Sequence, residues 1–257
     1  MNESKIYIAD IHPDLLGTYG DGGNAVVLAQ RLKWRGMQAE IVKVNSQSPI
    51  PSSCDFYCLG GGEDAPQAQS AYELRKSGAL NKAVESGAVV LGVCAGFQIL
   101  GDSFAVGGTD LQPGVGILDV TSVKGLGPRS VGEVMAVGQE PAKGIYLSGY
   151  ENHSGITLLG ASVSALASVI HGNGNNPTDN TEGAVNGRVI GTYLHGPVLV
   201  RNPQLADLLL SWVVEDLAPL DDSEIEILRS QRFSSFNHNN KSNLRSIFDS
   251  IGQKLNL

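Results

Sequence analysis

Short apolar runs alternate with helix-length segments through the first half of the chain. The runs are rich in β-branched residues, and the segments between them carry apolar residues at helical spacing. Buried strands separated by helices indicate a parallel sheet that is covered on both faces. The expected strands are KIYIAD (5–10), AEIVKV (39–44), FYCLG (56–60) and AVVLGV (88–93), and the expected helices cover 23–36 and 66–86, the latter broken at Gly78.

The second half of the chain is richer in expected strands. VGILDV (115–120) and GEVMAV (132–137) have strand patterns. In GAVNGRVIGTYLHG (183–196), Asn186-Gly187 lies between alternating residues and predicts a type I′ hairpin turn. A last helix is expected from Pro203, with Asn202 as its N-cap.

Composition indicates a globular protein. Of the 257 residues, 42% are hydrophobic and 17% are charged, and the net charge of −8 argues against binding to nucleic acid or anionic membranes. We expect no signal peptide and no membrane insertion, because polar residues follow Met1 and no apolar run approaches about 20 residues. Cys54 and Cys58 have no second pair at zinc spacing, so we expect core residues, no metal site and a reduced, cytoplasmic protein.

The third cysteine lies where an expected strand should pass into a helix, in GAVVLGVCAGFQILG (87–101). A buried cysteine is often only a small core residue. Here Gly92 and Gly96 flank Cys94, and they would permit a tight turn that presents the sulfur at the carboxyl edge of the sheet. The N–H groups at the start of the helix would favour a thiolate, and that of Ala95 could bind an oxyanion. The pattern therefore favours a nucleophile.

A thiolate nucleophile requires a proton donor and acceptor. His195 ends an expected strand just before Gly-Pro, where a parallel sheet collects catalytic groups. The alternative is a histidine that only makes ordinary hydrogen bonds at a strand end. His153, in SGYENHSG, is the second candidate, whereas His171 and His238 lie in polar segments.

Two glycine-rich segments follow expected strands. LGGGEDAPQ (59–67) could supply a second oxyanion N–H, from Gly61 or a neighbour. LLGTYGDGGNA (15–25) has no phosphate-binding lysine pattern, and the chain contains neither a P-loop nor a dinucleotide-binding βα turn. We therefore expect no cofactor in this chain, and an ATP-dependent reaction would need a partner.

Several separated motifs resemble those of class I (triad-type) glutamine amidotransferases. They are DLLGTYGDGGN, GGGEDAPQ, GVCAGFQILG, GYENHSG and YLHGPVLVRNPQLADLLL, within residues 4–216. The chain resembles the cobyric acid synthase-like branch, and most closely the GatD family of glutaminase subunits in MurT–GatD lipid II isoglutaminyl synthases. The resemblance implies a flavodoxin-like α/β fold, with a mostly parallel sheet, helices on both faces and an antiparallel, strand-rich second half.

One position departs from the wider superfamily. The glutamate that usually stands two residues after the histidine is replaced by Pro197, and the branch that the chain resembles also lacks this glutamate. The resemblance therefore implies a Cys94–His195 dyad and leaves a third catalytic residue open.

The resemblance also implies the reaction. Cys94 would attack the carboxamide of L-glutamine, and His195 would protonate the departing ammonia and then activate water to hydrolyse the thioester. By resemblance to GatD, Arg129 in GLGPRSVGE (125–133) would bind the α-carboxylate, unless it is only a solvated loop residue. Ammonia would pass to a MurT-like Mur ligase subunit, which would use ATP to amidate the D-glutamate of lipid II at the inner face of the membrane.

Other functions compete with this interpretation. A glutaminase for a cobyrinate-type amidation is the nearest alternative, although this chain shows no fused ATP-binding domain. A stand-alone thiol hydrolase would act without a partner and ignore glutamine. A catalytically silent scaffold would not need an intact Cys94 and His195.

Beyond the expected amidotransferase domain (1–217) we expect a separate tail (218–257). Its first part is polar and acidic, and apolar residues recur at helical spacing over 242–255, with Ser242 as N-cap. This pattern predicts an amphipathic helix, which could fold back on its own domain, dock on the partner or contact a membrane.

Overall fold

A six-stranded sheet forms the centre of the first part of the chain; the computed structural model describes residues 5–237. The strand order is β13-β14-β4-β3-β1-β2, and all neighbours are parallel except β13 and β14. The five parallel strands have the flavodoxin-like order, so the predicted fold class is confirmed. The strands are β1 (Ile6–Ile11), β2 (Ala39–Val44), β3 (Phe56–Leu59), β4 (Val89–Val93), β13 (Ala184–Asn186) and β14 (Val189–Thr192).

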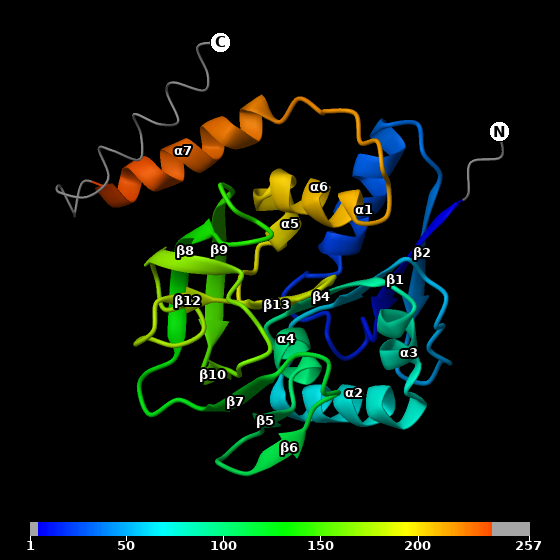
Figure 1. The fold of residues 1–257 in the computed structure, drawn as a ribbon. Helices are drawn as coiled ribbons and strands as arrows, with labels where there is room; N and C mark the ends of the chain where they lie inside the picture. Colours follow the sequence, from blue (N-terminus) through cyan, green and yellow to red (C-terminus); the bar gives the residue numbers. More distant parts are fainter. Residues whose placement is uncertain (1–4, 238–257) are drawn as a thin grey trace. The chain divides into compact units, whose positions relative to one another are not determined.

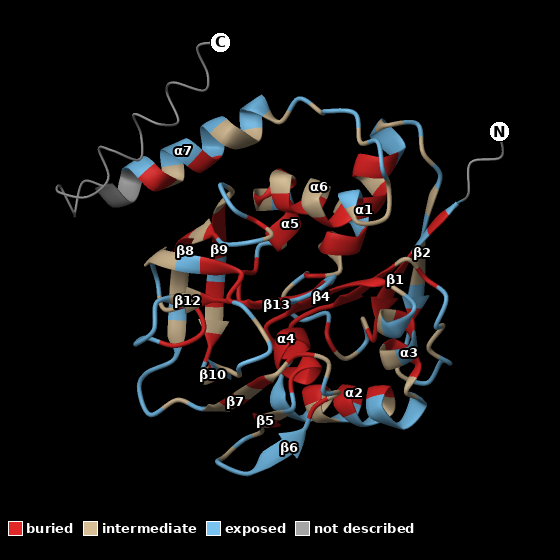
Figure 2. Ribbon diagram, in the orientation of Figure 1, coloured by how far each residue is buried: buried red, intermediate tan, exposed pale blue. Residues whose placement is uncertain are grey.

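Helices cover both faces of this sheet (Figure 1). One face carries α1 (Gly23–Trp34), α5 (Val198–Arg201) and α6 (Pro203–Ser211), and the other carries α2 (Asp64–Ser77), α3 (Ala79–Glu85) and α4 (Ala95–Leu100). Gly78, at φ +61°, ends α2 and begins α3, as the sequence predicted. Figure 2 shows that the central strands are buried, and β3, β4 and β14 are buried at every position.

Two further sheets of four strands each build the second half of the domain. The first has the order β10-β7-β5-β6 and the second β12-β11-β8-β9; their pairs are antiparallel except β5 with β7. Their strands are β5 (Ser103–Ala105), β6 (Leu111–Pro113), β7 (Val120–Lys124), β8 (Ser130–Gly138), β9 (Tyr146–His153), β10 (Gly155–Leu159), β11 (Ala167–His171) and β12 (Thr181–Glu182).

The prediction of a strand at 115–120 is wrong for all but its last residue. Gly116 has a φ of +71°, and the N–H groups of Ile117 and Leu118 both donate to the carbonyl of Leu100. The apolar residues of this segment therefore wrap the end of α4 as a bend, and the strand β7 begins only at Val120.

Two local predictions need correction. The hairpin at 183–196 forms, but Asn186 pairs with Val189, so the turn residues are Gly187 and Arg188, and only Gly187 has a positive φ. Asn202 precedes α6 as expected, but its side chain does not cap the helix. It bonds instead to the backbone N–H and carbonyl of Ser148, at 2.9 and 2.8 Å, and so fixes β9.

The chain divides into two compact units, Met1–Pro219 and Leu220–Leu257. The second unit contains α7 (Ser223–Asn237), a helix that the sequence analysis did not predict within its polar tail. The amphipathic helix predicted over 242–255 lies outside the described residues. No helix within residues 5–237 has the length and apolar character needed to cross a membrane.

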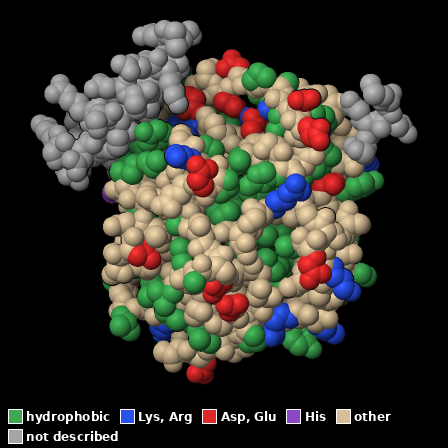
Figure 3. Space-filling view, viewed as in Figure 1, with side chains coloured by type: hydrophobic (Ala, Val, Ile, Leu, Met, Phe, Trp, Pro, Cys, Tyr) green, Lys and Arg blue, Asp and Glu red, His purple; other side chains and the backbone are tan. Residues whose placement is uncertain are grey.

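Acidic and basic side chains are interspersed on the surface. On the described part of the face shown in Figure 3 they alternate with apolar and polar residues. That face therefore presents no broad basic region.

A buried carboxyl group holds the end of β14. The side chain of Glu182 is fully buried, and it accepts hydrogen bonds from the hydroxyl of Thr192 and, at 3.0 Å, from the N–H of Tyr193. Burial raises the pKa of Glu182 to about 7, and the nearby carboxylate of Glu151 acts in the same direction, although the two hydrogen bonds oppose the shift.

The raised pKa of Glu182 predicts a pH-dependent stability. Below about pH 4.5 the Glu182 carboxyl is neutral in both the folded and the unfolded chain. As the pH rises from there, the carboxyl ionises in the unfolded chain while it stays neutral in the folded one. The contribution of this group to the free energy of unfolding is therefore lost as the pH rises to about 7. Glu182→Gln should remove the effect, which amounts to about 3 kcal/mol. Urea unfolding at pH 5 and pH 7.5 should show the variant gaining stability relative to wild type at the higher pH.

The exposed Glu85→Gln variant is the matched control and should follow wild type at both pH values. A stability difference between Glu182→Gln and wild type that does not change with pH would contradict the prediction.

Candidate active site

Cys94 occupies the turn between β4 and α4 in a backbone conformation that L-residues rarely adopt. Its φ and ψ are 53° and −104°. A Cβ added to Gly92 would lie 2.6 Å from Leu100 and 2.8 Å from the Gly96 carbonyl, and one added to Gly96 would lie 2.5 Å from the Leu59 carbonyl oxygen. Both glycines therefore lie where a side chain would not fit, which is consistent with the expected tight turn. The strained turn, held by the packing of α4 on the sheet, is typical of a nucleophile elbow.

His195 lies three residues beyond β14, and its position is fixed from two directions. Its backbone N–H and carbonyl form a bridge with Tyr150 of β9, with N···O distances of 2.9 and 3.1 Å. Its side-chain Nδ1 lies 2.9 Å from Oδ2 of Asp21. Within the described residues the other ring nitrogen, Nε2, has no hydrogen-bond partner. It can therefore exchange a proton with a reacting group.

Asp21 is the site residue that the sequence analysis missed. It is 1% exposed, and its Oδ2 also accepts the N–H of Gly61 at 3.0 Å. Its loop is held against the segment after His195, because a Cβ on Gly23 would lie 2.5 Å from Pro197. Asp21 lies within the glycine-rich motif DLLGTYGDGGN, and the resemblance carried by that motif was the one available signal.

The surroundings of His195 favour its charged form. Burial disfavours the imidazolium, but the hydrogen bond with Asp21 and the interaction with Cys94 outweigh burial and raise the pKa of His195 to about 10. The imidazole is therefore protonated at neutral pH, and Nε2–H can act as a general acid.

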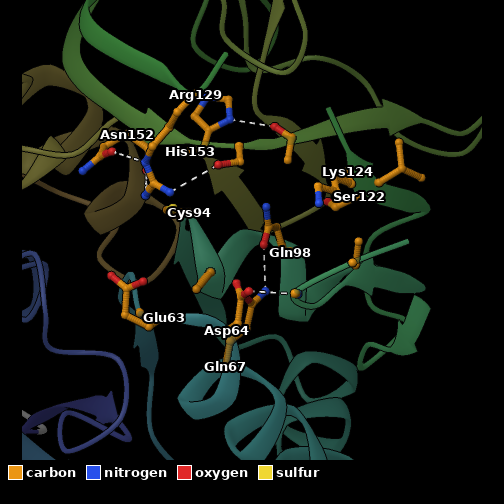
Figure 4. A pocket seen from close by; sticks show the side chains of 18 of the residues that line it. Glu63, Asp64, Gln67, Cys94, Gln98, Ser122, Lys124, Arg129, Asn152 and His153 are labelled. Atoms are coloured by element: carbon orange, nitrogen blue, oxygen red, sulfur yellow. Dashed lines mark hydrogen bonds between the residues drawn. The ribbon is translucent and has the colours of Figure 1, made fainter. Parts of the chain in front are cut away.

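Cys94 opens into a cleft of about 300 Å³ (Figure 4). Residues from both halves of the domain line it, because Gln67 and Gln98 belong to α2 and α4 whereas Asn152 and His153 belong to β9. The cleft is polar, and its volume suits a single small polar substrate.

Arg129 lines the same cleft, as the resemblance implied. Its Nε donates to Oδ1 of Asn152 at 2.6 Å, and Nη2 donates to the Asn152 carbonyl at 2.9 Å. A weaker bond of 3.3 Å joins Nη1 to Ser154. These contacts orient the exposed guanidinium within the cleft, where it could bind a carboxylate.

The two predicted oxyanion donors differ in position. Ala95 is the first residue of α4 and lines the cleft beside Cys94. The N–H of Gly61 instead donates to Asp21, and Gly62 is the glycine of that loop that lines the cleft. Gly61 provides space, because a Cβ there would lie 2.8 Å from Cε1 of His195.

Buried polar side chains link the helix of the nucleophile to the rest of the domain. Gln98 accepts from Gln67 at 2.7 Å and donates to the hydroxyl of Tyr193 at 2.9 Å, and that hydroxyl lies 2.6 Å from Oγ1 of Thr157. His153 stacks on Tyr193 with ring centroids 3.8 Å apart. Hydrogen bonds between buried side chains strengthen one another and hold these residues in one arrangement.

Of the other described histidines, only His153 lines the cleft of Cys94. His153 lines the cleft, but its Nδ1 is bonded to the Gly155 carbonyl at 2.8 Å. His12 is buried beside a separate hollow, bonded to Ser70 at 2.8 Å, and His171 ends β11 on the surface. His238 lies outside the described residues. No cluster of three or more metal-binding side chains occurs within residues 5–237.

Comparison with known proteins agrees with this geometry. Residues 7–203 match the CobB/CobQ-like glutamine amidotransferase domain. The chain belongs to this family. The predicted resemblance is thereby confirmed, and the nucleophile elbow and cleft are those of an amidotransferase domain.

Two relatives of this amidotransferase chain are named lipid II isoglutaminyl synthase (glutamine-hydrolyzing) subunit GatD. The one from Staphylococcus aureus (strain N315) is 35% identical over 230 residues, which cover 88% of this chain and 91% of the relative. The one from Streptococcus pneumoniae (strain ATCC BAA-255 / R6) is 30% identical and covers 80% of each chain. A probable cobyric acid synthase from Methanosphaera stadtmanae is 34% identical, but the match covers only 27% of that protein.

Solved structures share the fold of this amidotransferase. A crystal structure of a glutamine amidotransferase has a TM-score of 0.55 at 20% identity, covering 80% of this chain and 98% of that one. A Thermotoga maritima glutamine amidotransferase has a TM-score of 0.50 at 15% identity, covering 93% of this chain and all of that one.

The contact between Asp21 and His195 predicts a shift in the pH profile. Asp21→Asn removes a negative charge that raises the pKa of His195, so the imidazole should lose its proton at a lower pH. The alkaline limb of the kcat/KM profile for glutamine hydrolysis should move to lower pH, and kcat should fall by about 10²–10⁴-fold.

Asp216→Asn, which changes an exposed aspartate after α6, is the matched control and should follow wild type. If Asp21→Asn lowers kcat without moving the alkaline limb, Asp21 is not what sets the proton affinity of His195.

Proposed function

We propose that this chain is the glutaminase subunit of a two-subunit amidating enzyme, which hydrolyses L-glutamine at Cys94 and delivers the ammonia to an ATP-dependent partner. The observation that supports it most directly is the hydrogen bond between His195 and Asp21 beside the strained Cys94, which itself lines a small polar cleft. This arrangement provides a nucleophile, a proton donor and a group that orients the donor.

The proposed reaction has two stages. The sulfur of Cys94 attacks the side-chain carboxamide carbon, and the N–H groups of Ala95 and Gly62 stabilise the oxyanion. His195 then donates the proton at Nε2 to the departing nitrogen, so the C–N bond breaks, ammonia leaves and a γ-glutamyl thioester remains. In the second stage His195 accepts a proton from water as the water attacks the thioester, and glutamate leaves with the thiolate restored.

The acceptor is inferred from the GatD relatives. They are named as subunits of lipid II isoglutaminyl synthase, and each match covers four fifths or more of both chains. The cobyric acid synthase is matched over only about a quarter of its length, which makes the cobyrinate-type amidation the weaker candidate. We propose that the acceptor is the D-glutamate α-carboxylate of lipid II, at the cytoplasmic face of the membrane.

A second subunit is part of this proposal. Activating a carboxylate for amidation requires ATP, and the sequence contains no P-loop pattern. We propose a MurT-like Mur ligase subunit as the partner that binds both ATP and lipid II. Ammonia must pass to it directly, because ammonia released into water at neutral pH becomes ammonium, which is not a nucleophile.

The role of Cys94 can be tested by substitution and by labelling. Cys94→Ser should abolish glutamine hydrolysis, because the hydroxyl is a far weaker nucleophile, while the similar volume leaves the fold intact. Ammonia release from L-glutamine and the melting temperature are the two measurements. A glutamine-derived electrophile should label wild type at Cys94 alone.

Cys54→Ser is the matched control for this experiment, since Cys54 is a buried cysteine outside the cleft. It should keep both hydrolysis and labelling. Labelling of Cys54 or Cys58 in place of Cys94 would refute the assignment.

The role of Arg129 can be tested through substrate affinity. Arg129→Ala removes a charge-assisted hydrogen bond to the α-carboxylate, worth roughly 1.5–3 kcal/mol, so kcat/KM for glutamine should fall about 10–100-fold, mainly through KM. Arg188→Ala, which removes an exposed arginine bonded to the Gly87 carbonyl, should leave the kinetics unchanged. Unchanged kinetics in Arg129→Ala would show that another group binds the carboxylate.

A further inference from the structure

A tyrosine hydroxyl joins two opposite charges at one end of the cleft. The hydroxyl of Tyr19 donates to Oε1 of Glu63 at 2.8 Å and accepts a long hydrogen bond of 3.5 Å from Nη2 of Arg129. All three residues line the cleft with Cys94. In Figure 4 Glu63 and Arg129 lie on either side of Cys94.

The two charged groups are spaced for an α-amino-acid head group. Their hydrogen bonds share one oxygen atom, so Oε1 of Glu63 and Nη2 of Arg129 lie within about 6 Å of each other. The ammonium and carboxylate of an amino acid are attached to the same carbon, and the head group can bridge an acid and a guanidinium at this separation. A group with only a carboxylate would engage Arg129 alone.

Each charge also has a favourable interaction that does not involve Tyr19. Arg129 is bonded to the side chain and backbone of Asn152. Glu63 is the N-cap residue of α2, where the helix dipole favours a negative charge. Tyr19 lies in the loop before Asp21, its ring centroid is 4.9 Å from that of His195, and only its hydroxyl lies between the two charges.

We propose that Glu63 binds the α-ammonium of glutamine while Arg129 binds the α-carboxylate, and that the Tyr19 hydroxyl gives way as the head group enters. This inference rests on the proposed glutaminase function. It makes Glu63 the residue that selects a free amino acid over amides that lack an α-ammonium group.

The test compares two substrates in the full chain, purified with any protein that accompanies it. L-Glutamine and glutaramate carry the same carboxamide and carboxylate, but glutaramate lacks the amino group. Wild type should prefer glutamine in kcat/KM. Glu63→Gln should lower kcat/KM for glutamine about tenfold, since the group is exposed, and leave that for glutaramate unchanged. Tyr19→Phe should not raise KM for glutamine, because the hydroxyl only competes with the substrate.

The outcomes separate the inference from the function on which it rests. If wild type releases no ammonia from glutamine, the proposed function fails. If wild type is active and Glu63→Gln keeps the full preference for glutamine, or loses activity on both substrates equally, the role of Glu63 is refuted. A higher KM in Tyr19→Phe would assign the ammonium to Tyr19 instead. Glu85→Gln, an exposed acid on α3, is the matched control and should behave as wild type.

Discussion

The site depends on how closely α4 crosses the strands beneath it. Gly96 lies against the carbonyl of Leu59, and Gly92 lies against Gly96, so neither position has space for a side chain. This contact holds the backbone of Cys94 in a conformation that an isolated turn would abandon, at a cost of about 1–3 kcal/mol. The fully buried strands β3 and β4 provide the packing that offsets this strain.

The rest of the catalytic group is assembled from parts of the chain that are far apart in sequence. Asp21 and His195 are 174 positions apart, and they meet because the loops after β1 and β14 both reach the carboxyl edge of the sheet. The bridge from Tyr150 to His195 adds a tie to the antiparallel half. Pro197 stands where the wider superfamily has its glutamate, and here the carboxylate that contacts the histidine comes from the opposite end of the domain.

The sequence predicted what depends on periodicity and on local turns. The parallel strands, the break at Gly78 and the turn around Cys94 are each encoded within a few residues. The apolar pattern of 115–119 predicts a strand, because it suits burial against α4 as well as it suits a sheet. Asp21 was missed because an aspartate in a glycine-rich loop is ordinarily a turn residue, and only the folded loop brings it to His195. The resemblance identified Arg129 as a candidate substrate-binding residue. No sequence pattern indicated a role for Glu63, which is inferred from its hydrogen bond with Tyr19.

The residues proposed to react are buried, whereas the residues proposed to recognise the amino-acid head group are exposed. Cys94 and His195 are only 7% and 4% exposed, so the charges that develop during reaction are poorly screened by water and each hydrogen bond there has a large effect. Arg129 and Glu63 are exposed, so water and salt weaken the interaction that each charge makes on its own. Selectivity for an amino acid at the exposed end therefore requires two opposite charges that act on one head group together, which is the arrangement that the Tyr19 hydroxyl connects.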